Sequence, residues 1–414
     1  MSIMHEIAGP MRNDSASQGL DDYLESLISR SSVFRDRDAL RHDYLPSSLP
    51  HRDQELRHIG EILAPLLMNK KSSNALIYGK TGTGKTASIK LTSNIIAEKA
   101  KARGLSFIVS YANCRLEGTE YRTLAVIADS LGLSVPFTGL ATNEVFKRIA
   151  DELRHSEMSS LIILDEIDVL VKSYGDDLLY ELTRMNETLP KSRVAIVAIS
   201  NDLSFKEYLD PRVLSSLSEE EVIFKPYTAD ELRDILQARV SLAFNDGAVS
   251  DEVVNLVAAL SASEHGDARR ALNLLRVAGE IAERRASLKV TTDDVREALV
   301  KIEEDQIFEV CRSLPLHSKL LLAVISSLSK KNKTPTSGEV FGSYKQVASR
   351  LNLPELTYRR IAMLLNELEM VGLIESKTVN MGRHGRTRKM RFATAVDPVK
   401  RALQSDVLVA QLLE

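Results

Sequence analysis

The chain has 414 residues, of which 44% are hydrophobic and 27% charged, and this length predicts two or three domains rather than one. Its 54 basic and 57 acidic residues give a formal net charge of −3, which argues against a uniformly basic surface for nucleic acid. The two cysteines, Cys114 and Cys311, lie far apart in the sequence and exclude a disulfide framework or a cysteine-rich zinc site. Every apolar run is shorter than the roughly 18 residues of a membrane span, so an intracellular protein is expected.

The N-terminal half predicts a tail followed by an α/β core. Residues 1–20 are small and polar and predict a disordered tail. Residues 21–226 predict a nucleotide-binding α/β domain, because short apolar runs alternate with amphipathic helices, as in a parallel sheet covered on both faces. The expected strands lie in the runs at 74–79, 107–114, 161–168 and 193–200. An insertion at about 115–153 adds two helices, at 119–131 and 142–155, more than one crossover needs.

The C-terminal half predicts two further domains. In residues 227–306 the strand signal disappears and apolar residues recur three and four positions apart, which indicates an all-helical domain. Residues 307–396 predict a winged helix, because three helices precede two strand-like stretches around a glycine-rich basic turn. The three helices are expected at 319–329, 343–351 and 357–371, and residues 397–414 are expected to form a C-terminal helix.

Residues 79–86 read GKTGTGKT, which matches the phosphate-binding loop and lies between an apolar strand and a helix. Glycines in such a loop let successive backbone N–H groups point at phosphate oxygens. A lysine in this motif adds charge at the terminal phosphates, and the hydroxyl after it can ligate magnesium. A glycine-rich entry to a helix is the alternative, but the context favours a site for ATP or ADP with Mg²⁺ built from Gly82, Thr83, Gly84, Lys85 and Thr86.

Two polar groups follow expected strands and can reach the phosphates from the same edge of the sheet. Asp165 and Glu166 come directly after a buried strand, where Asp165 would hold magnesium and Glu166 would polarise the attacking water. An acidic strand end alone could equally be a solvated loop, and the phosphate loop upstream makes the functional interpretation stronger. Asn201 ends the next strand, where its amide could orient water or simply start a turn.

The C-terminal turn carries a basic cluster without an acidic residue between 377 and 391. Such a cluster in isolation is often a solvated surface, but this one lies next to a helix that begins TYRR at residue 357. A helix in the major groove and a flexible basic tip on phosphates and the minor groove are typical of winged helices on duplex DNA. The candidate DNA contacts are Arg359, Arg360, Arg383, His384, Arg386, Arg388 and Lys389.

The ordered combination of GKTGTGKT, LIILDEID, SND, GDARRAL and GRHGRTRK resembles the archaeal origin-recognition replication initiators. These are AAA+ proteins related to the eukaryotic origin recognition complex and its cell-division-cycle partner. The resemblance extends from about residue 33 to residue 395 and includes LPSSLPHRDQEL at 45–56. It implies an AAA+ core, a helical lid and a winged helix.

The resemblance also implies roles for residues that the pattern alone would leave as solvated or packing groups. Arg269 is similar to the family's second sensor and Asn201 to its first. Tyr227 and Arg239 match positions near the bound nucleotide. Arg212 is similar to the arginine offered to the γ-phosphate of a neighbouring subunit. The insertion at 115–153 matches an initiator-specific element that touches DNA.

From the resemblance we expect a cytoplasmic, nucleoid-associated ATPase that binds double-stranded origin DNA and uses slow hydrolysis as a switch. Its expected partners are the replicative helicase and other copies or paralogues of itself. No association with a membrane is expected. A DNA motor such as a branch-migration helicase and an ATP-dependent transcription regulator are the alternatives. Residues 311–396 hold 15 basic and 5 acidic residues, a net of +10, so the near-neutral total conceals a basic region attached to an acidic body.

Overall fold

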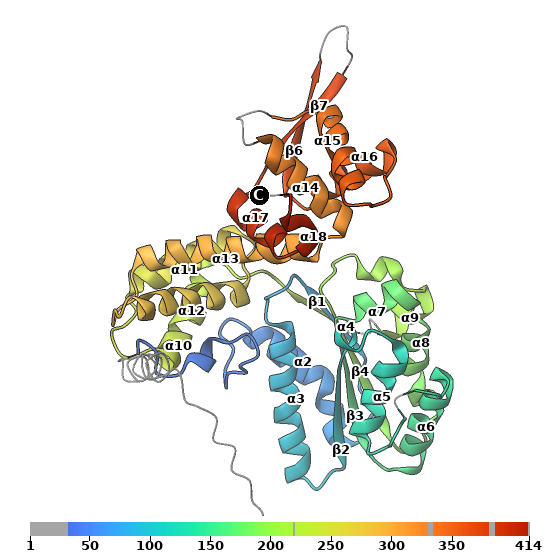
Figure 1. Ribbon diagram of the computed structural model, residues 1–414. Coiled ribbons are helices and arrows are strands. Elements are labelled where there is room, and N and C mark those ends of the chain that lie inside the picture. The colour runs from blue at the N-terminus through green and yellow to red at the C-terminus, as the bar shows by residue number, and fades with distance from the viewer. Residues whose placement is uncertain (1–31, 137, 218–219, 330–333, 381–385, 413–414) are drawn as a thin grey trace, which may run out of the picture. The chain divides into compact units, whose positions relative to one another are not determined.

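The computed structural model describes residues 32–136, 138–217, 220–329, 334–380 and 386–412 (Figure 1). The expected N-terminal tail lies outside these residues, as do Arg383 and His384. The chain forms two compact units, Met1–Val295 and Arg296–Glu414, each described here by itself. None of the described helices combines the length and the apolar character that a membrane crossing requires.

Five of the described strands form one parallel sheet in the first unit, with the order β2-β3-β4-β1-β5. In chain order they are β1 (Ala75–Gly79), β2 (Phe107–Asn113), β3 (Ser159–Asp165), β4 (Arg193–Ser200) and β5 (Glu220–Phe224). The apolar runs predict the first four, whereas β5 starts with acidic residues and gives a weaker signal. The pairing of Asn113 with Asp165, and of Asp165 with Ile199, brings the carboxyl ends of three strands to one edge.

Helices cover both faces of this sheet, because consecutive strand residues point to opposite sides. Leu161 and Ile163 of β3 pack toward α2 (Asp53–Leu63), η2 (Ala64–Met68) and α3 (Lys85–Ala102). Ile162 and Leu164 point the other way, into a core shared with the remaining helices of the α/β part. Those helices are α4 (Cys114–Glu117), α5 (Glu120–Ser130), α6 (Thr142–His155), α7 (Ile167–Tyr174), α8 (Asp177–Thr183), η3 (Met185–Glu187), η4 (Phe205–Tyr208) and α9 (Pro211–Leu217).

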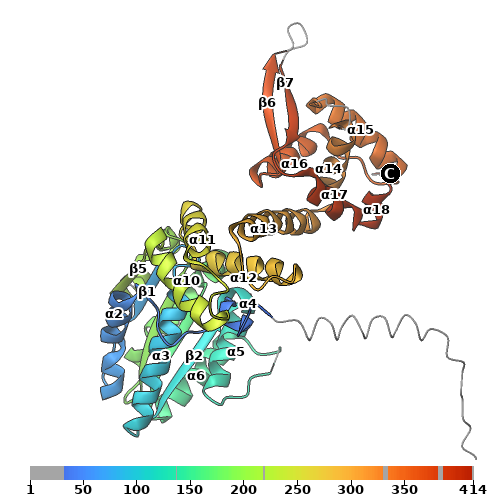
Figure 2. The same cartoon turned by 90° about the vertical axis from the view of Figure 1, so that its left-hand side faces the viewer.

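The lid follows the sheet and is all-helical, as the spacing of apolar residues predicts (Figure 2). Its helices are α10 (Ala229–Ala243), α11 (Asp251–Ser263) and α12 (Ala268–Arg284), and α13 (Thr292–Ser313) leads from the first unit into the second. Thr228 and Glu231 form a capping box that fixes the start of α10.

A strap at residues 32–48, which includes η1 (Arg37–Leu40), packs on these lid helices rather than on the sheet. The Phe34 ring lies 4.8 Å from the Phe244 ring, and a side chain at Gly279 would collide with Phe34. The expectation of a single α/β domain from residue 21 therefore misses the association of this segment with the lid.

The second unit contains the expected winged helix. It consists of α14 (Leu316–Ser329), α15 (Ser337–Arg350), α16 (Tyr358–Met370) and the antiparallel hairpin of β6 (Ile374–Asn380) and β7 (Arg386–Phe392). Helix α15 begins six residues earlier than expected, because Thr336 and Glu339 form a capping box. The expected C-terminal helix is instead split into α17 (Val396–Gln404) and α18 (Val407–Ala410), since Asp406 caps a new start. The fold class predicted from the sequence is otherwise confirmed.

Candidate functional site

The phosphate loop joins β1 to α3 in a conformation that needs glycine at two positions. Gly82 and Gly84 have φ of 71° and 94°, in the left-handed region that side chains disfavour. A Cβ on Gly82 would lie 1.7 Å from Asp267 Oδ1, and one on Gly84 would lie 2.7 Å from Tyr227 Oη. The two glycines therefore serve the turn and also the close approach of lid residues, which the motif alone does not reveal.

Lys85 is buried at the first position of α3, and its ammonium donates hydrogen bonds to the carbonyl oxygens of Gly79 and Lys80 at 2.8 and 2.7 Å. Burial lowers the pKa of Lys85 to about 8, although the nearby Asp165 carboxylate acts in the opposite direction. The loop thus holds a partly desolvated cation that an anion would stabilise.

The Asp165 carboxylate is the centre of a hydrogen-bond network at the carboxyl end of β3. Its Oδ2 accepts from the Thr86 hydroxyl at 2.8 Å and from the Tyr111 phenol at 2.7 Å, and its Oδ1 accepts from the Glu166 N–H at 3.0 Å. Burial, followed by the charge of Asp165, raises the pKa of Tyr111 well above its ordinary range, so the phenol remains a donor.

A hydroxyl and a carboxylate at this distance fit magnesium, which binds proteins through one or two carboxylates and takes its other ligands from phosphates and water. The described residues contain no group of three or more His, Cys, Asp or Glu side chains that could hold a metal without such help. The donor set therefore suits a cation that arrives with a nucleotide.

Glu166 has a left-handed backbone with φ of 54° at the start of α7. This conformation costs about 1 to 3 kcal/mol in a residue other than glycine and is often found at functional sites. Its carboxylate accepts a hydrogen bond from the Asn113 amide at 3.4 Å and forms an ion pair with Arg115 at 3.2 Å. Asn201 lies nearby, with its backbone N–H donating to Asp168 at 3.2 Å.

Most of the predicted nucleotide residues line one of two pockets that share lining residues. The smaller one, at the phosphate loop, is lined by Gly82, Thr83, Gly84, Lys85, Thr86, Asp165, Glu166, Asn201 and Arg269. The larger one has a volume of about 400 Å³ and shares Gly82, Gly84, Thr86 and Arg269 with the first. It also reaches Tyr227 and Arg239, so residues predicted from distant parts of the sequence meet here.

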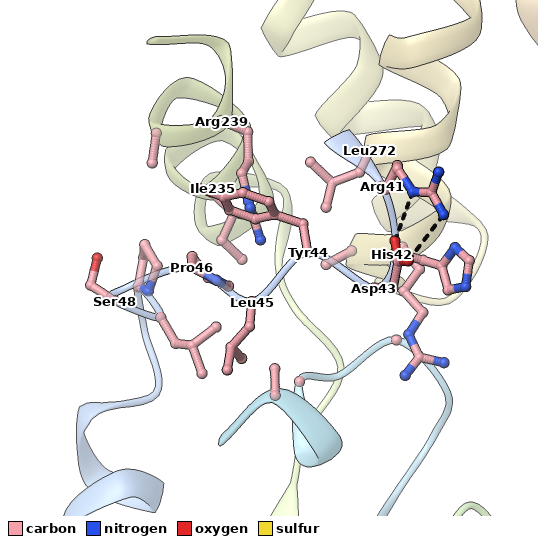
Figure 3. Close-up of a pocket in the computed structure, with 18 of the residues that line it drawn as sticks. Arg41, His42, Asp43, Tyr44, Leu45, Pro46, Ser48, Ile235, Arg239 and Leu272 are labelled. Atoms are coloured by element: carbon pink, nitrogen blue, oxygen red, sulfur yellow. Dashed lines mark hydrogen bonds and ion pairs between the residues drawn. The ribbon is translucent and has the colours of Figure 1, made fainter. Parts of the chain in front are cut away.

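The larger pocket has an apolar and aromatic wall that comes from the strap and the lid (Figure 3). The guanidinium of Arg239 lies 4.7 Å from the centre of the Tyr44 ring and donates to the Ala39 carbonyl at 3.1 Å. Ile235 and Leu272 lie on the lid side of the same space. Such a wall suits a planar base, while the phosphate loop at the other end suits an anion.

Arg52 is a component of the site that is missing from the predicted site residues, although it lies in the segment at 45–56 that takes part in the family resemblance. It is buried, and its Nε donates to the Thr83 carbonyl of the phosphate loop at 2.9 Å. Its Nη2 donates to the carbonyl of Lys225 after β5 at 2.7 Å, and its guanidinium stacks 3.8 Å from the Tyr227 ring. Arg52 therefore ties the loop to the segment that enters the lid.

Arg212 is absent from the lining of both pockets that the described residues form. It lies on α9 with an exposed side chain, pairs with Asp210 at 2.9 Å and lies over the Tyr180 ring at 5.5 Å. An exposed position is compatible with the expected action on a neighbouring copy.

The predicted DNA residues divide into two groups. Arg359 and Arg360 at the start of α16 and Arg386 on β7 are exposed, Lys389 is half-buried, and these four form no ion pair with any residue that the structure describes. Arg388 instead faces the protein: it donates to Asn366 Oδ1 and Ser376 Oγ at 2.6 and 2.7 Å and pairs with Glu369. The structure gives Arg388 a bracing position between β7 and α16, unlike the other predicted contacts among the described residues.

Comparison with known proteins gives matches over nearly the whole chain. Family models match for an AAA domain at residues 68–209, a Cdc6 AAA+ ATPase-type lid domain at 233–299 and a CDC6 C-terminal winged helix domain at 309–402. The chain is 47% identical to the ORC1-type DNA replication protein 1 of Sulfurisphaera tokodaii over 398 residues, which cover 96% of this chain and 99% of that protein. It is 46% identical to the ORC1-type DNA replication protein of Thermococcus onnurineus, with 93% and 95% covered.

Among solved structures, the Aeropyrum pernix ORC1 protein in complex with DNA matches with a TM-score of 0.81 and 47% identity, covering 92% of this chain and 100% of that one. The Pyrobaculum aerophilum protein Cdc6p matches with a TM-score of 0.59 and 23% identity, which supports the fold alone.

Proposed function

This chain belongs to the family of ORC1-type DNA replication proteins, and on that premise we propose that it is an ATP-dependent initiator that binds origin duplex DNA. The observation that carries the proposal is that one chain contains both a phosphate-loop pocket and a winged helix with a basic surface. Of the residues predicted to act on the phosphates, the pocket includes all except Arg212. The first binds and hydrolyses ATP, and the second reads DNA.

In the nucleotide site each residue has a role that its contacts support. Gly82, Thr83 and Gly84 present the loop backbone to the phosphates, and Lys85 neutralises their charge. Thr86 and Asp165 would hold Mg²⁺, which supplies charge neutralisation of the phosphates when it is bound.

The remaining roles concern water and the lid. Glu166 polarises the attacking water and Asn201 orients it. Arg269 and Tyr227 report the nucleotide to the lid, while Arg239 and the strap enclose the base.

Hydrolysis is slow in the isolated protein and acts as a switch. Arg212 is exposed and lies outside the pocket residues, so we assign it to the γ-phosphate held by a neighbouring copy or paralogue. An arginine supplied in this way contributes a factor of about 10³ to 10⁵ to phosphoryl transfer, which the isolated chain lacks.

On DNA, Arg359 and Arg360 of α16 enter the major groove, while Arg386 and Lys389 of the hairpin contact phosphates. Arg383 and His384 belong to the same interface by family resemblance alone. The insertion at about 115–153 supplies a second contact with the duplex. DNA held in this way recruits the replicative helicase.

The test separates the switch from the reader. Lys85→Ala and Glu166→Gln are each expected to abolish ATP hydrolysis while changing origin DNA affinity less than about threefold, because both side chains lie in the nucleotide pocket. Phosphate release and fluorescence anisotropy on origin duplexes would measure the two properties. Lys99→Ala, at an exposed position of the same helix α3, is the matched control.

A large loss of DNA affinity in the two pocket variants would contradict the separation. Closed hexamers with fast, DNA-stimulated turnover and little sequence preference would instead identify a DNA motor.

A further inference from the structure

Tyr111 contacts the metal-site carboxylate from the neighbouring strand. In the parallel pairing of β2 with β3, Asn113 is opposite Asp165 and Tyr111 is opposite Ile163. Because side chains alternate along a strand, Tyr111 and Asn113 point to the same face, two residues apart. This register lets the phenol reach forward to Asp165 Oδ2 at 2.7 Å.

Three donors together fix the orientation of the Asp165 carboxylate. Thr86 and Tyr111 both donate to Oδ2, and the Glu166 N–H donates to Oδ1. Two of the three belong to groups already assigned to the site. The Tyr111 phenol is the additional one, and it comes from a strand that contributes no residue to the phosphate-loop pocket as described.

The Tyr111 ring is itself held in place. It is half-buried against the core between the sheet and helices α2 and α3, and the Lys90 ammonium lies 4.2 Å from the ring centre. Lys90 follows Thr86 by four residues on α3, so both lie on the same face of the helix. The helix that carries the phosphate loop therefore contacts both the phenol ring and the carboxylate that it orients.

We propose that Tyr111 is a positioning residue for the magnesium site: its hydroxyl holds the Asp165 carboxylate in the orientation that binds the cation together with Thr86. The inference rests on the proposed function, because it concerns the same site. Groups that hydrogen-bond to a metal ligand typically change metal affinity or activity by about 10- to 100-fold when they are removed.

The chain provides a closely matched control. Tyr78 on β1 donates to Glu221 at 2.9 Å, and Lys206 lies 5.1 Å from the centre of its ring. The arrangement of tyrosine, carboxylate and lysine is similar, although Lys206 also pairs with Glu221, and Tyr78 is not among the residues that line the phosphate-loop pocket. Tyr78→Phe and Tyr111→Phe each remove a single hydroxyl and leave the ring.

The experiment measures binding of a fluorescent ATP analogue to the full chain, first in EDTA and then during a titration with MgCl₂. Tyr111→Phe is expected to raise the Mg²⁺ concentration for half-maximal effect about tenfold and to change the affinity in EDTA by less than about twofold. Tyr78→Phe is expected to match the wild-type protein in both measurements.

An unchanged Mg²⁺ midpoint in Tyr111→Phe would overturn the inference, and so would an equal loss of affinity with and without Mg²⁺, which would indicate packing alone. If Mg²⁺ has no effect on the wild-type protein, the magnesium role in the proposed function fails and the inference fails with it. A wild-type response with no difference in Tyr111→Phe would leave the proposed function intact.

Discussion

The Lys85 ammonium keeps its charge in a buried position, where two carbonyl oxygens and a nearby carboxylate only partly replace water. The folded protein lowers the pKa of this group from 10.5 to about 8. Between these pH values the unfolded chain binds more protons than the folded one. The contribution of Lys85 to the free energy of unfolding therefore increases as the pH rises through this window.

A bound triphosphate should reverse the shift, because its negative charge favours the ammonium form. At pH 8, ATP binding is expected to take up about half a proton, and affinity should fall as the pH rises further. Calorimetric titrations with ATP in HEPES and in Tris, which differ in ionisation enthalpy, would measure this uptake. Lys85→Arg, whose guanidinium stays charged, should remove this proton uptake. Equal heats in the two buffers for the wild-type protein would contradict the prediction.

The second residue-scale prediction concerns Glu166, the carboxylate assigned to polarise the attacking water. Arg115 is exposed, and its ion pair with Glu166 occupies a carboxylate that hydrolysis needs free. An exposed pair adds at most about 1 kcal/mol to stability, so Arg115→Ala should leave the melting temperature nearly unchanged. We expect it to raise the rate of phosphate release from saturating ATP several-fold.

Arg148→Ala provides the control for this prediction. It removes a comparable exposed pair with Glu144 on α6 of the same insertion, and neither residue lines the phosphate-loop pocket. A lower rate in Arg115→Ala would mean that its positive charge assists hydrolysis instead.

At the scale of elements, the winged helix has a brace between its hairpin and helix α16. Arg388 on β7 contacts Asn366 and Glu369 of α16 and Ser376 of β6, so one guanidinium joins three elements. A guanidinium whose N–H groups already donate to several protein partners has few donors free for a phosphate. We therefore expect Arg388 to set the geometry of the interface, whereas Arg386 contributes charge to it.

Salt dependence can distinguish these two roles. If Arg359 and Arg360 contact phosphates in addition to Arg386 and Lys389, four cations give a slope of log affinity against log salt of about −3.6, or roughly two decades between 50 and 200 mM. Arg386→Ala should reduce the magnitude of this slope by about 0.9. Arg388→Ala should lower affinity at every salt concentration while leaving the slope unchanged. A slope reduced equally by both variants would show that Arg388 also contacts DNA.

Elements with strong local signals could be predicted from the sequence. The apolar runs around Leu161 and Ile196 are buried over their whole length, as a parallel sheet requires. The motif GKTGTGKT predicts a loop between a strand and a helix, because that is the context in which it binds phosphate. The early start of α15 was also readable, because Thr336 and Glu339 have the spacing of a capping box. The split at Asp406 has the same kind of local cause.

Residues that act through tertiary contacts could not be predicted in this way. Tyr111 belongs to no motif, and Arg52 lies in the resembling segment at 45–56 without any indication of its role there. Both roles depend on which chain segments the fold brings beside these residues. Arg388 is a different case: its place in a basic cluster predicts a DNA contact, and the structure adds protein partners that the cluster does not indicate. A charge pattern indicates how many cations an element has, but only the structure assigns partners to them.

At the scale of the whole molecule, charge is divided along the chain. Residues 311–396 carry a net of +10 and the remainder carries −13, so the acidic part includes the nucleotide site and the basic part includes the winged helix. This division places the strongest non-specific attraction to DNA in the basic part of the protein. It also explains why the total charge of −3 carries no information about DNA binding.

The wall of the larger pocket should affect how long a bound nucleotide stays in the protein. It is formed by the phosphate loop, by the lid and by a strap that Phe34 fastens to the lid. We expect a nucleotide bound between these parts to leave when lid and strap move away from the loop, so that a conformational step would limit its exchange. The protein would then act as a timer: it keeps the nucleotide it last bound for as long as the lid stays closed, whatever the ATP concentration has since become.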